Sequence, residues 1–371
     1  MTRGPDDPLT RDPKKEGRRL DRLVVKLRRL PLYPFEWICL FLTVGSIGIL
    51  RYKGMRIDWR TVEYTVYPMV RALPQPLLLG VGLQLVVLLI LRKPLAGFLS
   101  ALKSWRWWGL WLRLWIVCMA LTYTYFWVKV CVPLLRTDLY DPTLWKLDRF
   151  MHLGFSPSVF ATALFETSDV AGWLDRWYGL WTPSVLVMLA FFTASADSLL
   201  RRRFMLSCVF LWGLGCWLYV ALPALGPIFY VPELWKEIAG RIPSASAMHD
   251  ALWANYQKML AGRNGVLREF NPIYAIAAMP SLHVGAHALF AIWSWRHARP
   301  ISLVFIVATF FTFLGSLVTG WHYAVDGYVG ILLAFVSYRL AFALERGREA
   351  AGSSLRGDDG GHTHLNRQGG S

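Results

Sequence analysis

Cysteine and charged residues are scarce in this sequence. Its 371 residues include five cysteines, and only 17% of the residues are Asp, Glu, Lys or Arg. No cysteine pair has the spacing of a metal or redox motif, and every cysteine lies in an apolar run, so we interpret all five as small core hydrophobes. These are Cys39, Cys118, Cys131, Cys208 and Cys216. The start of the sequence is polar and basic, and it does not predict a secretory signal peptide.

Acidic residues are scarcer than basic ones. The chain has 24 Asp and Glu against 40 Lys and Arg, a formal net charge of +16, yet 55% of its residues are hydrophobic. This apolar content excludes disorder over most of the chain. A basic chain often binds nucleic acid, but a soluble domain could not bury so much apolar surface and still offer a nucleic-acid face. A membrane protein with basic cytoplasmic edges explains both features, and we expect no nucleic-acid partner.

Apolar stretches recur along the sequence at about the length that a bilayer-crossing helix needs. They predict an all-α fold, a polytopic transmembrane helix bundle of about eight spans. The predicted spans are 35–50, 77–91, 107–135, 173–194, 204–222, 280–295, 301–318 and 323–342. Trp and Tyr residues mark many of their ends, as in the aromatic belts of membrane proteins, and this accounts for the 19 tryptophans.

The placement of Lys and Arg predicts the orientation of the spans. If the N-terminal segment lies inside, the inner segments hold 24 of the 40 basic residues and the outer segments hold 13. Basic residues concentrate on cytoplasmic loops. We therefore expect an integral membrane protein with both termini in the cytoplasm and its long loops on the extracytoplasmic face.

Three segments are too polar to be spans. The first is the cytoplasmic segment 1–34, in which residues 18–30 have leucine and valine at helical spacing among basic residues. This pattern predicts either an amphipathic helix on an anionic membrane surface or a solvated basic tail. The tail 346–371 is rich in Gly, Ser and Arg, and it is predicted to be disordered. The long outer loop 223–279 is expected to carry short helices at 233–239 and 249–260.

Two short segments late in the chain contain ionisable residues of the kinds that catalyse reactions by proton transfer or nucleophilic attack. His283 opens the predicted span 280–295, and His322 opens the span 323–342. From His283 the chain crosses inward along 280–295 and returns outward along 301–318, so both histidines are expected at the outer face. His322 and Asp326 are i and i+4 on one helix face, close enough for the carboxylate to accept a hydrogen bond from the imidazole. Ser281 begins a helix whose N–H groups can hold phosphate.

This constellation suits covalent phosphoryl transfer. A neutral histidine oriented by a carboxylate can attack phosphorus, while a second histidine protonates the leaving oxygen. Polar ionisable residues at membrane depth are costly, and they point to function. The residues therefore predict His283, His322 and Asp326 as catalytic.

The two motifs in this order, PSLH followed by HYxxD, resemble the lipid phosphatase and phosphotransferase superfamily that includes the type 2 phosphatidic acid phosphatases. MPSLHVG together with WHYAVDGYVG is similar, more closely, to the inositol phosphorylceramide synthase branch, the aureobasidin-target inositol phosphotransferases. The resemblance covers about 107–342. It implies a six-helix catalytic core at 107–345 that follows an N-terminal addition of two spans at 35–106.

The resemblance also implies roles for individual residues. His322 would be the nucleophile, Asp326 would orient it, and His283 would act as general acid and then as base for the accepting hydroxyl or water. Ser281 would contact phosphate, and Gly226-Pro227 resembles the Gly-Pro segment of this branch. The scheme implies no metal or other cofactor, a membrane lipid as donor, an alcohol or water as acceptor, and a place in sphingolipid and inositol-lipid metabolism.

The sequence departs from the phosphatase members at their cationic positions. Those members carry a Lys and an Arg-Pro pair before the first His, and a Ser-Arg pair before the nucleophile. In this chain Gly315 and Ser316 stand at the positions of the Ser-Arg pair. A bound phosphate group still needs a positively charged group beside it. Arg263 and Arg268 are the nearest candidates in sequence. Further candidates are Arg241, Lys258, Lys129 and Arg113. The missing cations favour the phosphotransferase branch.

Two other classes of function stay open at this stage. His287 is one helical turn from His283, so that His283, His287, His322 and Asp326 could form a metal site with nitrogen and oxygen ligands. A non-catalytic membrane scaffold would use none of these side chains.

Overall fold

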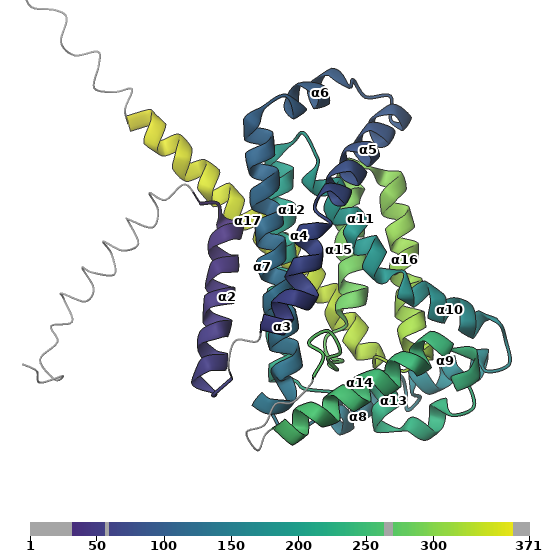
Figure 1. Ribbon diagram of the computed structural model, residues 1–371. Coiled ribbons are helices and arrows are strands. Elements are labelled where there is room, and N and C mark those ends of the chain that lie inside the picture. The colour runs from purple at the N-terminus through teal and green to yellow at the C-terminus, as the bar shows by residue number, and fades with distance from the viewer. Residues whose placement is uncertain (1–31, 56–58, 263–269, 359–371) are drawn as a thin grey trace, which may run out of the picture.

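The computed structural model describes residues 32–55, 59–262 and 270–358, with side chains described up to residue 347. The described residues form helices and no strands, and the longest helices stand side by side as a bundle (Figure 1). The predicted all-α bundle is confirmed. The segment 18–30 and the candidates Arg263 and Arg268 lie outside the described residues.

Within the described residues, five helices are long and apolar enough to cross a membrane by their length and composition. They are α2 (Pro34–Tyr52), α7 (Trp105–Leu135), α12 (Ser198–Ala221), α16 (Arg299–Val318) and the segment Ala324–Gly347 of α17 (Ala324–Asp358). A bent pair, Trp59–Arg71 with Pro74–Ile90, makes a sixth candidate with a 49° break. Several membrane-length helices of this kind are typical of an integral membrane protein.

The other two predicted spans fall on shorter helices, α11 (Trp181–Thr193) and α15 (Leu282–His297). The expected span 173–194 is divided, because α10 (Val170–Gly179) ends before α11 begins. Gly179 and Pro183 flank this break, and both residue types favour helix boundaries. At the other end of the chain, α17 continues to Asp358, so the segment 346–358, which was expected to be disordered, is helical instead.

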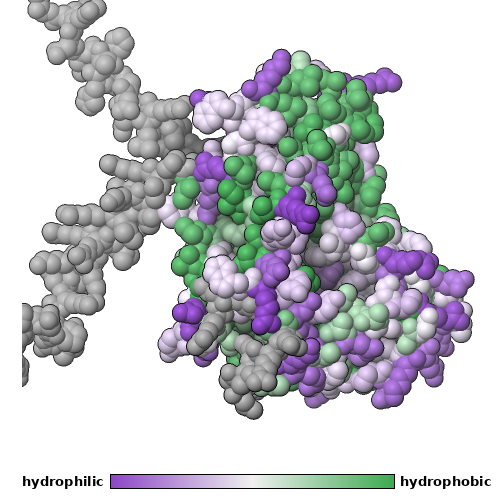
Figure 2. Space-filling model, viewed as in Figure 1, coloured by the Kyte–Doolittle hydropathy of each residue, from purple (hydrophilic) through white to green (hydrophobic). Residues whose placement is uncertain are grey.

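A cap made of several short helices and the longer α14 covers one end of the bundle (Figure 1). We use "the cap" for α8 (Asp141–Met151), α9 (Pro157–Phe165), α13 (Pro227–Tyr230), η3 (Pro232–Trp235), η4 (Ala239–Arg241) and α14 (Pro243–Ala261). The helix predicted at 249–260 lies within α14, whereas 233–239 forms only 3₁₀ turns at its edges. In Figure 2 apolar side chains gather over the upright helices and hydrophilic ones over the cap, as expected for a bundle in lipid with a cap in water.

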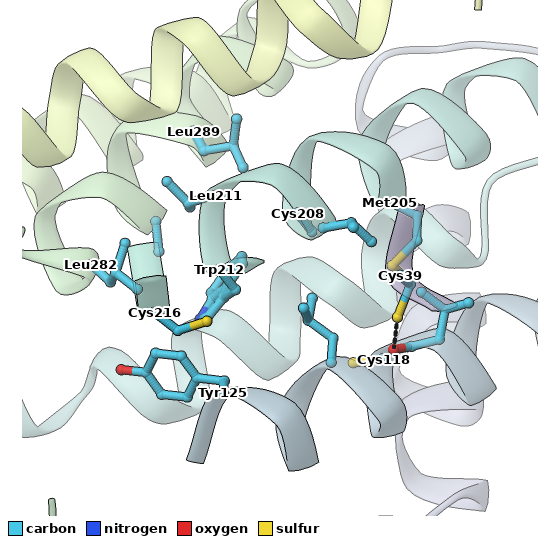
Figure 3. Close-up of a cluster of buried hydrophobic side chains, with 14 of the residues drawn as sticks. Cys39, Cys118, Tyr125, Met205, Cys208, Leu211, Trp212, Cys216, Leu282 and Leu289 are labelled. Carbon is cyan, nitrogen blue, oxygen red and sulfur yellow. Dashed lines mark hydrogen bonds between the residues drawn. The ribbon is translucent and has the colours of Figure 1, made fainter. Parts of the chain in front are cut away.

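The core of the bundle is made where α7 and α12 meet α2, α15 and α17. Figure 3 shows part of this core, including Cys39, Cys118, Cys208 and Cys216 among leucine and aromatic side chains. All five cysteines are buried and unbridged. The prediction that they are core hydrophobes is confirmed.

The remaining described helices are α3 (Trp59–Thr61), η2 (Val62–Val66), α4 (Tyr67–Arg71), α5 (Pro74–Ile90) and α6 (Ala96–Leu102).

Candidate active site

His322 lies in the tight loop between α16 and α17. The carbonyl of Ser316 accepts hydrogen bonds from the N–H groups of Trp321 and His322, at 3.1 and 3.3 Å. The loop turns at Gly320, whose φ of +70° favours glycine. The sequence therefore builds a compact turn that presents His322 just before α17 begins.

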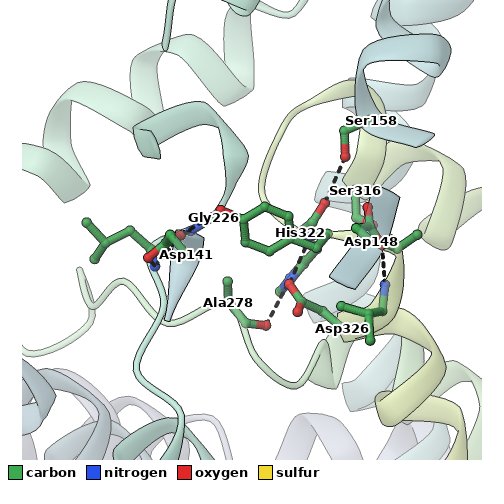
Figure 4. Close-up of polar contacts among 12 residues, drawn as sticks. Asp141, Asp148, Ser158, Gly226, Ala278, Ser316, His322 and Asp326 are labelled. Carbon is green, nitrogen blue, oxygen red and sulfur yellow. Dashed lines mark hydrogen bonds and ion pairs between the residues drawn. The ribbon is translucent and has the colours of Figure 1, made fainter. Parts of the chain in front are cut away.

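Two oxygen atoms hold the Nδ1 atom of His322. It lies 2.8 Å from the carbonyl oxygen of Ala278 and 3.4 Å from Oδ2 of Asp326 (Figure 4). A carbonyl oxygen can only accept a hydrogen bond. Nδ1 therefore carries the hydrogen in the neutral imidazole, and the unshared electron pair is on Nε2.

Asp326 forms hydrogen bonds with residues of both motifs. Its Oδ2 accepts the N–H of Tyr323 at 2.9 Å, and its backbone carbonyl accepts the N–H of Ser281 at 2.9 Å. The side chain is fully buried. The i,i+4 spacing thus brings the carboxylate to His322, and the backbone of the same residue anchors the start of α15.

His283 is held differently, by aromatic rings. Its ring centroid lies 4.7 Å from that of Tyr178 and 4.3 Å from that of Trp181. The His283 and His322 centroids are 5.9 Å apart. Residues that are distant in sequence therefore bring the two imidazoles close together, with their planes tilted by 57° to each other.

Close helix packing sets this separation. A Cβ atom on Gly285 would lie 2.8 Å from the carbonyl oxygen of Gly330, and one on Gly330 would clash with the carbonyl oxygen of Ser281. Only glycine at both positions lets α15 and α17 approach this closely, because backbone atoms cannot move aside as a side chain can.

Both histidines line a cavity of about 340 Å³. Its walls come from α7, α10, α11, α14 and the segment 273–277, and they include the aromatic residues Tyr125, Phe126, Tyr178, Trp181 and Trp321. Lys129 of α7 also lines it. The cavity is therefore largely apolar, with imidazoles and an amine as its basic groups, which is the usual character of a small-molecule site.

The other predicted phosphate-binding residues lie nearby in different settings. Ser281 is buried, its hydroxyl has no hydrogen-bond partner within the described residues, and it is not among the cavity-lining residues. Gly226 has φ +104°, and its N–H donates to Oδ1 of Asp141 at 2.8 Å. It packs against the backbone of Trp321, and Pro227 opens α13. Gly226-Pro227 therefore supports the His322 loop, and the Gly226 N–H is already engaged.

His287 does not join the histidine pair. Its Nε2–H donates to Ser184 Oγ at 2.6 Å, because the Ser184 hydroxyl donates to the carbonyl of Trp181. Its Nδ1 lies 2.9 Å from the hydroxyl of Thr312. Both nitrogens are thus used within the bundle, and no group of three or more possible metal-ligating side chains occurs among residues 32–55, 59–262 and 270–358. These contacts do not fit the metal site considered from the sequence.

Sequence reasoning missed two buried aspartates of α8. Asp148 accepts the N–H groups of Ala324 and Val325, at 3.2 and 3.0 Å, and so caps the N-terminus of α17. Asp141 accepts the Leu225 and Gly226 N–H groups and the Tyr323 hydroxyl. Burial raises the pKa of both carboxyls above the usual range, and the N–H donors oppose this rise. Neither residue has a sequence signal, because each lies in a polar segment whose burial depends on tertiary packing.

No curated protein and no solved structure matches the chain significantly. A family model described as "PAP2 superfamily" matches residues 142–340. The match covers more than half of the chain and includes α15, the His322 loop and the start of α17. It supports a membrane phosphatase or phosphotransferase that acts on a lipid. The chain therefore belongs to the PAP2 superfamily.

Proposed function

We propose that this protein is a membrane lipid phosphotransferase that works through a phosphohistidine at His322. The observation that carries the proposal is the hydrogen bond from His322 Nδ1 to the Ala278 carbonyl at 2.8 Å, with the Asp326 carboxylate at 3.4 Å. It leaves Nε2 as the nucleophilic atom of a neutral ring, in a residue that lines the cavity.

In the first half-reaction, Nε2 of His322 attacks phosphorus and forms the N–P bond. The bond between phosphorus and the leaving oxygen breaks, and His283 donates a proton to that oxygen. The positive charge that develops on the His322 imidazole is stabilised by the buried Asp326 carboxylate. The ring centroids are 5.9 Å apart and both rings line the same cavity, so both histidines can contact one phosphate group there.

In the second half-reaction, a hydroxyl group attacks phosphorus. His283 removes its proton, the N–P bond breaks, and His322 returns to its starting state. Water as acceptor gives a phosphatase, and an alcohol gives a transferase. The largely apolar cavity favours the alcohol, because an organic acceptor can displace water there.

More specifically, we propose that the enzyme transfers an inositol-phosphate or similar alcohol-phosphate group in sphingolipid metabolism. This proposal rests on the resemblance of MPSLHVG and WHYAVDGYVG to the inositol phosphotransferase branch, and on Gly315 and Ser316 where phosphatase members have Ser-Arg. The excess of Lys and Arg in the inner segments supports a site on the extracytoplasmic face and both termini in the cytoplasm. The proposed catalytic core is 107–345, after two N-terminal spans.

The proposal is tested by comparing lipids from cells that express the wild type with those from cells that express His322→Ala. We expect a headgroup-modified lipid to accumulate only with the wild type, and purified His322→Ala to lose turnover by roughly 10³-fold or more. His297→Ala is the matched control, because His297 lies at the opposite end of α15 from His283. Full turnover by His322→Ala on lipid phosphates would overturn the assigned nucleophile. Loss of a lipid phosphate without a new lipid would instead indicate a phosphatase.

A further inference from the structure

We infer that Lys129 supplies the cation that binds the phosphate group in this cavity, in place of the arginines that are absent from the family's usual positions. The inference rests on the proposed function and extends it. It assigns a binding residue that lies outside the matched segment 142–340. The lysine comes from α7, which precedes that segment in the chain.

The first support is the position of Lys129. It is partly exposed and lines the same cavity as His283 and His322. Among the described residues that line this cavity, Lys129 is the one lysine or arginine. The other described candidates lie elsewhere. Lys258 lines a separate pocket, Arg241 lies 4.0 Å from Asp169 at the protein surface, and Arg113 forms an ion pair with Glu36.

The second support is that Lys129 has no counterion within the described part of the chain. No carboxylate there lies within ion-pair distance of its amine. Asp175 also lines the cavity, but its two oxygens accept the N–H groups of Ser244 and Ala245, at 2.9 and 3.0 Å. A lysine inside a membrane-crossing helix is costly, and it is retained where it binds something. An anionic ligand is therefore the missing partner.

The third support is that the amine is held in place. Nζ of Lys129 lies 5.8 Å from the ring centroid of Tyr125 and 5.4 Å from that of Tyr219. These cation–π contacts orient the ammonium group without neutralising it. The charge stays available to a phosphate oxygen in surroundings of low dielectric constant, where such an attraction is stronger than in water.

The placement also fits the chemistry of phosphoryl transfer. Negative charge on the non-bridging oxygens must be stabilised while the N–P bond forms at His322 and the bond to the leaving oxygen breaks. His283 is committed to the leaving oxygen, so a separate cation is needed for the other oxygens. Lys129 meets this need from the α7 wall of the cavity.

The first test uses orthovanadate, a phosphate mimic, as the probe. Its binding to the purified full-length protein in detergent is measured by calorimetry at low salt. We expect Lys129→Met to weaken vanadate binding by at least about tenfold and Lys129→Arg to stay within about threefold of the wild type. The control variant is Lys146→Met, which removes an exposed lysine of α8, and it should bind as the wild type does. Equal binding by Lys129→Met, or no binding by the wild type, would overturn the inference.

A second measurement needs no variant and so does not depend on the folding of one. Cyanate carbamylates accessible lysine amines, and peptide mass spectrometry quantifies each site in the wild type. Vanadate should protect Lys129 but not Lys146. Equal modification of Lys129 with and without vanadate would overturn the inference. Neither measurement requires turnover, so failure here is distinguishable from failure of the proposed function, which the turnover of His322→Ala decides.

Discussion

The two histidines of the cavity are held by different forces. We name the side with His322 the α17 wall, after the helix that follows it, and the side with His283 the α15 wall, after the helix that contains it. On the α17 wall, hydrogen-bond acceptors fix Nδ1 of His322, and Asp148 in turn caps the helix that carries Asp326. On the α15 wall, the His283 ring is stacked on Tyr178 and contacts the tilted ring of Trp181, and no described residue forms a hydrogen bond with it. Both rings are positioned, but only one has its proton assigned to a particular nitrogen.

The difference suits the two proposed roles. A nucleophile needs one nitrogen that stays unprotonated, and an acceptor at the other nitrogen ensures this. A residue that donates and then removes a proton needs nitrogens that no other group occupies. Stacking provides orientation without engaging the nitrogens. The comparison predicts that changes on the α17 wall act on the nucleophile, whereas changes on the α15 wall act on proton transfer.

The largest effect is expected at Asp326. Asp326→Asn keeps the size of the side chain but removes the charge beside His322, and we expect turnover to fall by about 10²–10⁴-fold, by analogy with carboxylate–histidine pairs in other enzymes. Single-turnover assays should show slower formation of the phosphoenzyme. The exposed Asp138→Asn is the control. Normal phosphoenzyme formation in Asp326→Asn would show that the two walls do not differ in this way.

Gly330→Ala breaks the contact that joins the walls. Its Cβ would clash with the backbone carbonyl of Ser281, so α15 and α17 must separate. We expect a loss of about 1–3 kcal/mol in stability, measured as a lower unfolding temperature in detergent, together with reduced activity. Gly45→Ala of α2 is the matched control, because a Cβ atom there would have no neighbour within 4 Å. Equal stability of the two variants would contradict the proposed role of close packing.

Asp148→Ala weakens the α17 wall from a distance. It leaves the N–H groups of Ala324 and Val325 without their acceptor, at an expected cost of about 1–3 kcal/mol. The unfolding temperature should fall and activity should fall with it, since His322 precedes the frayed turn. Asp148→Asn should recover part of the loss, because its amide oxygen can accept one N–H. No recovery would indicate that the charge, and not the hydrogen bond, is what matters.

Trp181→Leu should have the smallest effect. It removes one of the two aromatic rings that contact His283 and leaves His322 and its acceptors in place. We expect turnover to fall about tenfold, a cost of roughly 1.4 kcal/mol, with a changed pH profile of the proton-transfer step and unchanged phosphoenzyme chemistry at His322. Trp105→Leu changes an exposed tryptophan of α7 as the control. A pH profile identical to that of the wild type would remove the distinction between stacking and hydrogen bonding.

Much of the site was predictable because its signals are local. His322 and Asp326 are one helical turn apart, and the direction of successive spans predicts that His283 and His322 share a face of the membrane. The division of 173–194 into α10 and α11 was not predicted, because apolar content continues across Leu180. The division matters, since Tyr178 and Trp181 lie on either side of it and both rings contact His283.

The sequence by itself determined the helical, membrane-type fold, and it predicted the two histidines and the aspartate as the candidate catalytic residues, because hydropathy and i,i+4 spacing are properties of the chain alone. Only the tertiary structure decided which buried carboxylates cap which helices, which nitrogen of His322 holds its proton, and that Lys129 shares a cavity with the histidines. These depend on how each helix is rotated against its neighbours. That rotation is set by packing between residues far apart in the chain, such as Gly285 against Gly330.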